Sequence, residues 1–183
     1  MEGEWEIYNR FLAGDESALE QIIGKYKDGL ILYLNSFVKN LSAAEELTEE
    51  TFVKLVLRKP RFLKKSGFKT WLFAIARNAA LDSFRKGTLA ASLEQIGPIC
   101  DEEADLERGY IQRETKIRLH RVMRSLKPEY QQVLWLVYFE GFSLREVGTI
   151  MKKSTHNTET LVYRARNALK AKLLKEGFVY EDL

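Results

Sequence analysis

The sequence is poor in the residues that most often build metal centres and disulfide frameworks. Of its 183 residues, one is cysteine (Cys100), two are histidine and three are proline. A single cysteine excludes an intramolecular disulfide and indicates a reducing setting, where Cys100 is either a redox sensor or an incidental thiol. His120 and His156 lie far apart in the sequence. No Cys/His cluster therefore has the ligand spacing of a metal site.

Long apolar runs and glycine-rich loops are also missing. The longest uncharged run, 29–38, is well short of the about 20 residues that a membrane-spanning helix needs. The first ten residues, MEGEWEIYNR, lack the basic-then-apolar pattern of a secretory signal. No segment resembles a phosphate-binding loop, and the glutamates at 45–50 lack the Glu-x-x-His motif of carboxylate metal sites. We therefore expect a cytoplasmic protein without membrane insertion, catalytic residues, metal or cofactor, which is not an enzyme.

The charges are separated along the chain, although the net charge is only +3. Basic residues dominate 58–86 and 152–175, where Asp82 and Glu159 are the lone acids. An acidic run lies between them and comprises Glu94, Asp101, Glu102, Glu103, Asp105 and Glu107. This arrangement indicates two surfaces that face nucleic acid, joined by an acidic segment.

Apolar residues recur at helical spacing along most of the chain, and no useful length alternates with a period of two. The pattern predicts helices near 4–12, across 19–37, over 42–59, 71–86 and 114–126, from 128, from 143, and ending near 176. Ser42 with Glu45 and Ser143 with Glu146 are predicted capping boxes. We expect an all-α protein with a helical domain at 1–86, a flexible acidic linker at 87–113 and a second helical domain at 114–183.

The second domain contains a helix-turn-helix pattern. A short capped helix, FSLREVGTIM at 142–151, is followed by a tight turn and a longer basic helix. In this arrangement the second helix enters the major groove, and its first residues reach base edges. The candidate contacts are Thr155, His156, Asn157, Glu159, Thr160 and Tyr163 for bases, with Arg164 and Arg166 for phosphates. A helical bundle with a solvated basic face is the alternative.

A second candidate surface precedes and includes the helix WLFAIARNAALDSFRK at 71–86. Its loop interleaves cations with aromatics, at Lys64, Lys65, Phe68 and Lys69. Aromatic faces stack on unpaired bases while lysines hold the backbone of a single strand. Arg77, Asn78, Asp82 and Arg85 are predicted to project opposite the apolar stripe of the helix. Alternatively, Phe68, Trp71 and Phe73 are core residues, and Asp82 pairs with Arg85 along the helix.

These residues resemble a known family. The pattern Trp-Leu-x-x-Ile-Ala-Arg-Asn-x-x-x-Asp-x-x-Arg, the preceding AEELTEETF and the later LKPEYQQVLWLVYFEGFSLREVG and YRARNALK look like bacterial sigma-70 family RNA polymerase sigma factors. They are most similar to the small extracytoplasmic-function group (group IV), which retains only regions 2 and 4. The resemblance covers about 15–86 and 115–172.

The resemblance implies a factor that directs core RNA polymerase to promoter DNA and helps to melt it, with an anti-sigma factor as a typical further partner. The 44–52 helix would dock on the polymerase through Glu46, Leu47, Glu49 and Glu50. The loop from Phe62 to Lys69, with Arg77, Asn78 and Asp82, would open and read the minus-ten element. The helix-turn-helix would read the minus-thirty-five element, and the acidic linker would thread toward the RNA exit path.

The start of the recognition helix departs from the family. Many members carry Gly-Thr-Val-Lys-Ser-Arg where this chain has HNTETL at 156–161. Because Glu159 and Leu161 replace the usual cations, we expect phosphate anchoring at Lys152, Lys153 and Arg164. Two other functions stay open. One is a stand-alone helix-turn-helix regulator with an N-terminal dimerisation or sensor bundle, and the other is a helical protein-binding adaptor.

Overall fold

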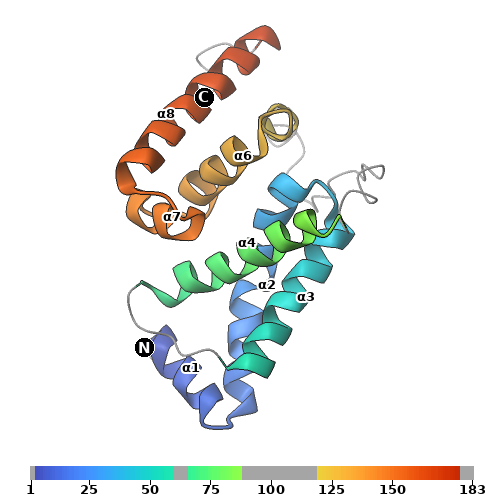
Figure 1. The fold of residues 1–183 in the computed structure, drawn as a ribbon, viewed down its shortest axis with the longest axis vertical. Helices are drawn as coiled ribbons and strands as arrows, with labels where there is room; N and C mark the ends of the chain where they lie inside the picture. The colour runs from blue at the N-terminus through green and yellow to red at the C-terminus, as the bar shows by residue number, and fades with distance from the viewer. Residues whose placement is uncertain (1–2, 60–65, 88–118, 178–183) are drawn as a thin grey trace, which may run out of the picture.

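The computed structural model describes residues 3–59, 66–87 and 119–177, and all regular structure in these ranges is helical. Two groups of helices lie one above the other along the long axis of the molecule (Figure 1). The N-terminal group contains α1 (Glu4–Leu12), α2 (Glu16–Val38), α3 (Leu41–Arg58) and α4 (Phe68–Arg85). The C-terminal group contains a helical segment at 119–124, α6 (Pro128–Leu134), the π-helix η2 (Trp135–Phe139), α7 (Leu144–Met151) and α8 (Thr155–Lys175). The predicted all-α class is confirmed.

Short polar side chains cap the starts of α2, α3, α7 and α8, but not always through the predicted residues. Ser143 caps α7, and its backbone N–H donates to Oε2 of Glu146 at 2.9 Å, so this predicted capping box is confirmed. The prediction of a capping box at Ser42 is wrong. Asn40 caps α3 by accepting a hydrogen bond from the Ala43 N–H at 2.9 Å, which leaves Ser42 exposed inside the first turn.

Helix α4 begins at Phe68, three residues earlier than predicted, after Gly67 as its N-cap. The ring of Phe68 is buried and lies 5.3 Å from the ring of Tyr8 and 5.8 Å from that of Tyr26. Burying this ring against α1 and α2 draws Phe68 and Lys69 into the helix. The prediction that both residues lie in the preceding loop is therefore wrong.

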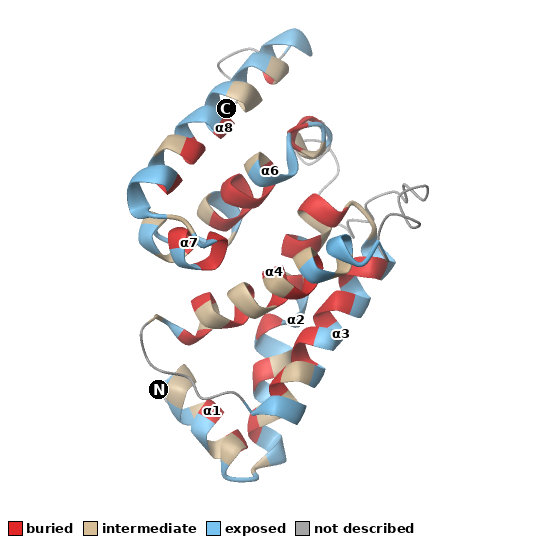
Figure 2. Cartoon of the chain, in the orientation of Figure 1, coloured by how far each residue is buried: buried red, intermediate tan, exposed pale blue. Residues whose placement is uncertain are grey.

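One continuous apolar core runs through both groups. It includes Leu34 and Leu72 in the N-terminal group and Leu136 and Ile150 in the C-terminal group. Figure 2 shows buried residues on the facing sides of α4, α6 and α7, whereas the outer faces of α3 and α8 are exposed. The core thereby fixes the position of one group on the other. The linker predicted at 87–113 lies outside the described residues, apart from Gly87.

Among the residues that the structure describes, no helix is long and apolar enough to cross a membrane.

Candidate nucleic-acid interface

The turn between α7 and α8 is tight because a glycine lies beneath it. Lys152 ends α7 with a left-handed backbone (φ 56°), and Ser154 caps α8 by accepting from the N–H of Asn157 at 3.2 Å. A Cβ on Gly148 would lie 2.8 Å from the carbonyl oxygen of Lys153 and 3.1 Å from Oγ1 of Thr158. The missing Cβ thus allows the turn and the first turn of α8 to pack directly on α7.

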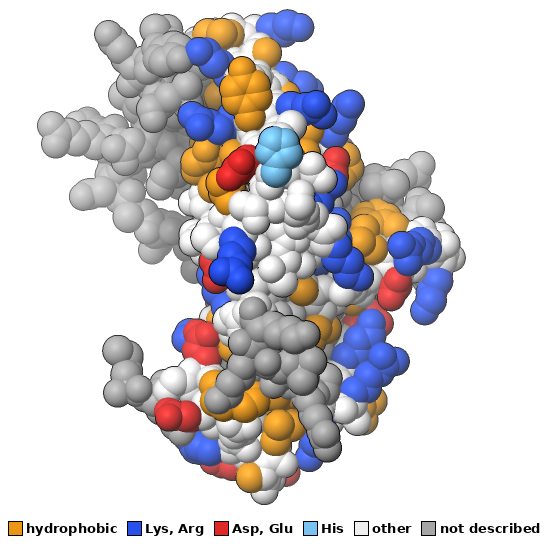
Figure 3. Space-filling view, turned by 60° about the vertical axis from the view of Figure 1, so that its left-hand side comes forward, with side chains coloured by type: hydrophobic (Ala, Val, Ile, Leu, Met, Phe, Trp, Pro, Cys, Tyr) orange, Lys and Arg blue, Asp and Glu red, His pale blue; other side chains and the backbone are white. Residues whose placement is uncertain are grey.

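The polar start of α8 projects away from the core. Thr155, His156, Asn157, Glu159, Tyr163, Arg164 and Arg166 are exposed, and Thr160 is half-buried. Lys152 is exposed, whereas half-buried Lys153 forms an ion pair with Glu129 at 2.8 Å. Figure 3 shows basic side chains gathered over the upper part of the molecule, where the C-terminal group lies. The helix-turn-helix therefore brings the predicted duplex-contacting residues onto one accessible surface.

The predicted single-strand residues do not share one surface. Asp82 and Arg85 are exposed and form a pair at 3.5 Å, as one alternative predicted, and Asn78 is half-buried. Arg77 is only 9% exposed, and its Nε donates to Oε1 of Gln132 in α6 at 2.8 Å. The prediction that Arg77 projects into solvent is wrong, because the C-terminal group covers that side of α4. Phe62, Lys64 and Lys65 lie outside the described residues.

The outer face of α3 contains the predicted polymerase contacts, with one exception. Glu46, Glu49 and Glu50 are exposed, but Leu47 is buried at 4% exposure and packs in the core. Glu46 and Glu50 line a groove of about 550 Å³ between α3 and α4, in which Asp82 also lies. The structure thus brings the predicted polymerase-binding and single-strand surfaces next to each other.

Two apolar residues on this face were missed in the sequence. Val53 is 51% exposed and Leu57 is 78% exposed. Together with Glu46 and Glu50 they follow the spacing i, i+4, i+7 and i+11, which places all four on one side of α3. The sequence does contain a signal for this exposed apolar pair. Val53 and Leu57 do not share the helical spacing of the buried positions Thr48, Phe52 and Leu55, so they lie on another side of the helix.

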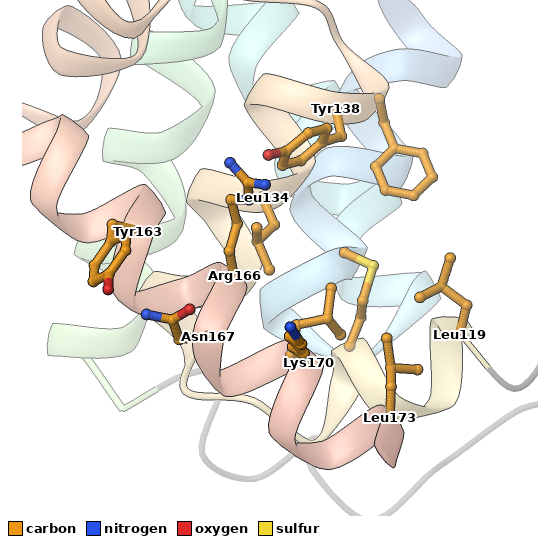
Figure 4. A pocket seen from close by; sticks show the side chains of 11 residues that line it. Leu119, Leu134, Tyr138, Tyr163, Arg166, Asn167, Lys170 and Leu173 are labelled. Carbon is orange, nitrogen blue, oxygen red and sulfur yellow. The ribbon is translucent and has the colours of Figure 1, made fainter. Parts of the chain in front are cut away.

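A larger groove of about 650 Å³ lies in the C-terminal group, between α8 and the helices α6 and η2 (Figure 4). Its floor is apolar and includes Met123, Leu134 and Leu173, while Arg166 and Lys170 from α8 lie at its wall. The flank of the recognition helix therefore combines apolar surface with positive charge.

Comparisons with known proteins agree with this geometry. Residues 22–89 match sigma-70 region 2, and residues 116–169 match sigma-70 region 4. The chain is 30% identical over 155 residues to the ECF RNA polymerase sigma factor SigM of Bacillus subtilis (strain 168), covering 84% of this chain and 93% of that protein. It is 29% identical over 174 residues to the ECF RNA polymerase sigma factor BldN of Streptomyces coelicolor, covering 93% of this chain and 66% of that protein. The fold is similar to that of CnrH in complex with the cytosolic domain of CnrY, with a TM-score of 0.67 at 20% identity, covering 94% of this chain and 97% of that one.

The fold, the helix-turn-helix and the matches to regions 2 and 4 together show that this protein is a transcription initiation factor of the sigma-70 class. The chain belongs to the extracytoplasmic-function sigma factors. It directs core RNA polymerase to promoters, and the alternative of a stand-alone regulator is not favoured.

Proposed function

We propose that the two helix groups divide a promoter between them. The start of α8 reads the minus-thirty-five element as duplex, and α4 with the preceding loop holds the opened minus-ten strand. The observation that carries this proposal is the exposed polar start of α8, at the end of a turn whose geometry Gly148 permits. Asn157 and Glu159 there have the donor and acceptor groups that major-groove readout requires.

Strand opening in this proposal depends on α4 and on polymerase. Extruding one base costs a few kcal/mol, which the cations and the half-exposed Asn78 of α4 would offset by holding the strand. Polymerase would bind the face of α3 that carries Glu46, Glu50, Val53 and Leu57, because exposed apolar residues within a charged rim are typical of a protein interface. The factor itself would contribute no catalytic step and would act in the cytoplasm, with polymerase.

Transcription with purified components tests the function as a whole. The chain is added to sigma-free bacterial core polymerase with fragmented genomic DNA, and the transcript starts are mapped. We expect new starts that share a two-part upstream motif. Silence together with polymerase-independent binding to a palindromic site would support the regulator instead, since half-sites of such proteins lie about 10 bp apart or a multiple of that.

Two substitutions test the assignment of α8. Asn157→Ala and Glu159→Ala should each change the preference at particular upstream bases, by about 1–3 kcal/mol per contact. Binding to a library of mutated promoters by the polymerase holoenzyme measures this preference. A uniform loss across all sequences would instead place these side chains at the phosphates or in a structural role.

We propose an anti-sigma factor as a further partner. The solved structure of CnrH contains the cytosolic domain of CnrY, and that of a RpoE from Bartonella quintana contains the anti-sigma factor NepR. The groove beside α8 supports such a partner, because its apolar floor and basic wall fit an acidic amphipathic helix. Extract of the source bacterium should inhibit transcription by the purified holoenzyme, and Tyr138→Glu at the exposed edge of the groove should relieve this inhibition by repelling an acidic helix. Equal inhibition of both forms would argue against the groove.

A further inference from the structure

Helix α4 begins without a side-chain cap from its own sequence. Its N-cap is Gly67, which has no side chain to accept a hydrogen bond. The N–H of Trp71 reaches the Gly67 carbonyl oxygen at 3.1 Å, whereas the N–H groups of the three residues between them have no carbonyl partner within the helix. Loss of a side-chain cap typically lowers the equilibrium constant for helix formation about fivefold. The first turn of α4 therefore needs a partner from elsewhere in the fold.

Glu4, the first residue of α1, supplies that partner. Its carboxylate accepts a hydrogen bond from the backbone of Lys69, at the second position of α4. Its Oε1 also accepts from Nζ of Lys25 at 2.6 Å and from the hydroxyl of Tyr26. A carboxylate is stabilised at a helix N-terminus because the free N–H groups there carry partial positive charge. Donors from α2 and α4 thus hold one carboxylate of α1.

The protonation states suit this arrangement. Partial burial acts to raise the pKa of Glu4, but hydrogen bonds from Lys25, Tyr26 and the Lys69 backbone hold that pKa below its ordinary value of 4.5. Burial and the neighbouring Glu4 carboxylate raise the pKa of the Tyr26 hydroxyl far above its ordinary value of 10.0. At neutral pH the carboxylate is therefore ionised and the hydroxyl remains a donor.

Aromatic packing joins the same two helices. The Tyr8 ring meets the Trp71 ring edge to face, with centres 5.3 Å apart, and the Phe68 ring lies 5.6 Å from that of Trp71. Glu4 and Tyr8 are four residues apart, so both lie on the side of α1 that meets α4. Figure 1 shows the N-terminal end of α1 close to the start of α4. Polar and apolar contacts with α1 therefore fix the first turn of α4 together.

This first turn begins the side of α4 on which the proposed function places the opened strand. Trp71 and Asn78 are seven residues apart, which puts them on the same side of the helix, and both are half-buried. Aromatic and polar side chains in a row of this kind suit a single strand only while the helix beneath them is formed. The match to sigma-70 region 2 begins at residue 22, so α1 lies before it.

We propose that Glu4 is a positioning residue for promoter opening, which caps α4 from α1 and holds its first turn in the form that captures the strand. Glu4 itself contacts no DNA in this proposal, which rests on the proposed function of α4. A first turn that is formed for only a fraction of the time would weaken strand capture by that fraction. Loss of the cap should therefore impair opening and spare the initial binding of duplex DNA, which depends on α8.

Opening and initial binding are measured separately with the polymerase holoenzyme. The DNA is a promoter found by mapping transcript starts, with 2-aminopurine in its minus-ten element, whose fluorescence rises when the base leaves the stack. Gel shifts at low temperature measure the affinity of the closed complex. Glu4→Ala should lower the equilibrium constant for opening about fivefold, as expected for the loss of one cap. Affinity in the closed complex should stay within about twofold, because contacts to duplex phosphates are unchanged.

Two further variants separate positioning from a merely structural role. Glu4→Gln retains an oxygen that can accept from the Lys69 backbone, so opening should return to within about twofold of the wild type. Asp15→Ala is the matched control. Asp15 caps α2 by accepting from the Ser17 N–H at 3.0 Å and pairs with Arg10 at 2.6 Å, and its side chain is 33% exposed, against 36% for Glu4. This variant should leave opening unchanged, although it also removes a carboxylate cap from the same helix group.

Chemical denaturation of the two alanine variants measures any loss of stability alongside opening. An equal opening defect in Glu4→Ala and Asp15→Ala, or normal opening by Glu4→Ala, would overturn the positioning role. A defect in Glu4→Gln as large as that in Glu4→Ala would also overturn it, because the cap would then not be what matters.

Asn78→Ala tests the proposed function of α4 on the same promoter. If this variant opens the promoter as well as the wild type does, α4 does not hold the strand, and the positioning role falls with it. If Asn78→Ala impairs opening and Glu4→Ala does not, α4 keeps its proposed function and the role of Glu4 is refuted. We expect both variants to impair opening.

Discussion

At the scale of single residues, Gly148 decides whether the helix-turn-helix can form. Alanine there would place a Cβ 2.8 Å from the backbone carbonyl of Lys153, which cannot move without shifting the turn. We expect Gly148→Ala to lower the free energy of unfolding by about 1–3 kcal/mol, as overpacking does. Chemical denaturation measures the loss. The control is Gly24→Ala, an open helical position where alanine should add roughly 0.5–1 kcal/mol; equal effects would contradict the close packing.

Glu146 makes stability depend on pH. Hydrogen bonds from the Ser143 hydroxyl and backbone N–H hold the pKa of this carboxyl below its ordinary value of 4.5. A lowered pKa stabilises the fold fully above the ordinary value, and this contribution is lost as the pH falls through the lowered value. Glu146→Gln should therefore flatten the acid limb of a plot of denaturation midpoint against pH. If the acid limb is unchanged in this variant, the loss of stability at low pH comes from other carboxylates.

Several side chains could not be placed from the sequence, for a physical reason that they share. The helical phase of 71–86 predicted an apolar stripe of Leu72, Ile75, Ala76 and Ala79, of which all but the half-buried Ile75 lie in the core. The same phase put Arg77 on the opposite, solvent side, because the pattern of one helix carries no signal of a second helix group above it. Leu47 was likewise chosen with its glutamate neighbours, although its own spacing from Ala43, Ala44 and Thr51 marks the buried face.

At the scale of elements, α3 shows how two plausible caps compete. Asn40 and Ser42 both belong to the residue types that cap helices, but only Asn40 accepts a hydrogen bond from the N–H three residues on. Asn40→Ala should lower the free energy of unfolding by about 1 kcal/mol. Ser42→Ala should leave it within about 0.5 kcal/mol, as expected of an exposed position. A larger loss at Ser42 in thermal denaturation would contradict this cap assignment.

Most helices could be predicted from periodicity and breakers, whereas deviations from regular helix could not. The pattern located α1 at 4–12, and Pro128 correctly marked the first turn of α6. The π-helix at Trp135–Phe139 was not predicted, since its apolar residues fit an ordinary helical period. In the structure, the rings of Trp135 and Phe139 at the two ends of this π-helix stack with their centres 4.4 Å apart.

At the scale of the whole molecule, the two groups resemble separate modules in sequence but share one core in the structure. Regions 2 and 4 match separate parts of the chain. Polar contacts of Lys69, Thr70 and Arg77 nevertheless join them, together with the Phe73–Phe142 ring pair. A continuous core couples the unfolding of its parts, and separating the two groups would expose the rings of Phe73 and Phe142.

This coupling should be visible in calorimetry. The wild-type chain is expected to unfold in a single transition, with equal calorimetric and van't Hoff enthalpies, because the contact between the two groups links them. Phe142→Ala removes a buried ring from that contact, where such a truncation costs about 3–5 kcal/mol, and should split the transition into two. Phe139→Ala is the control, since Phe139 is 45% exposed and stacks on Trp135 within its own group. Two transitions already present in the wild type would show that the groups unfold independently despite their shared core.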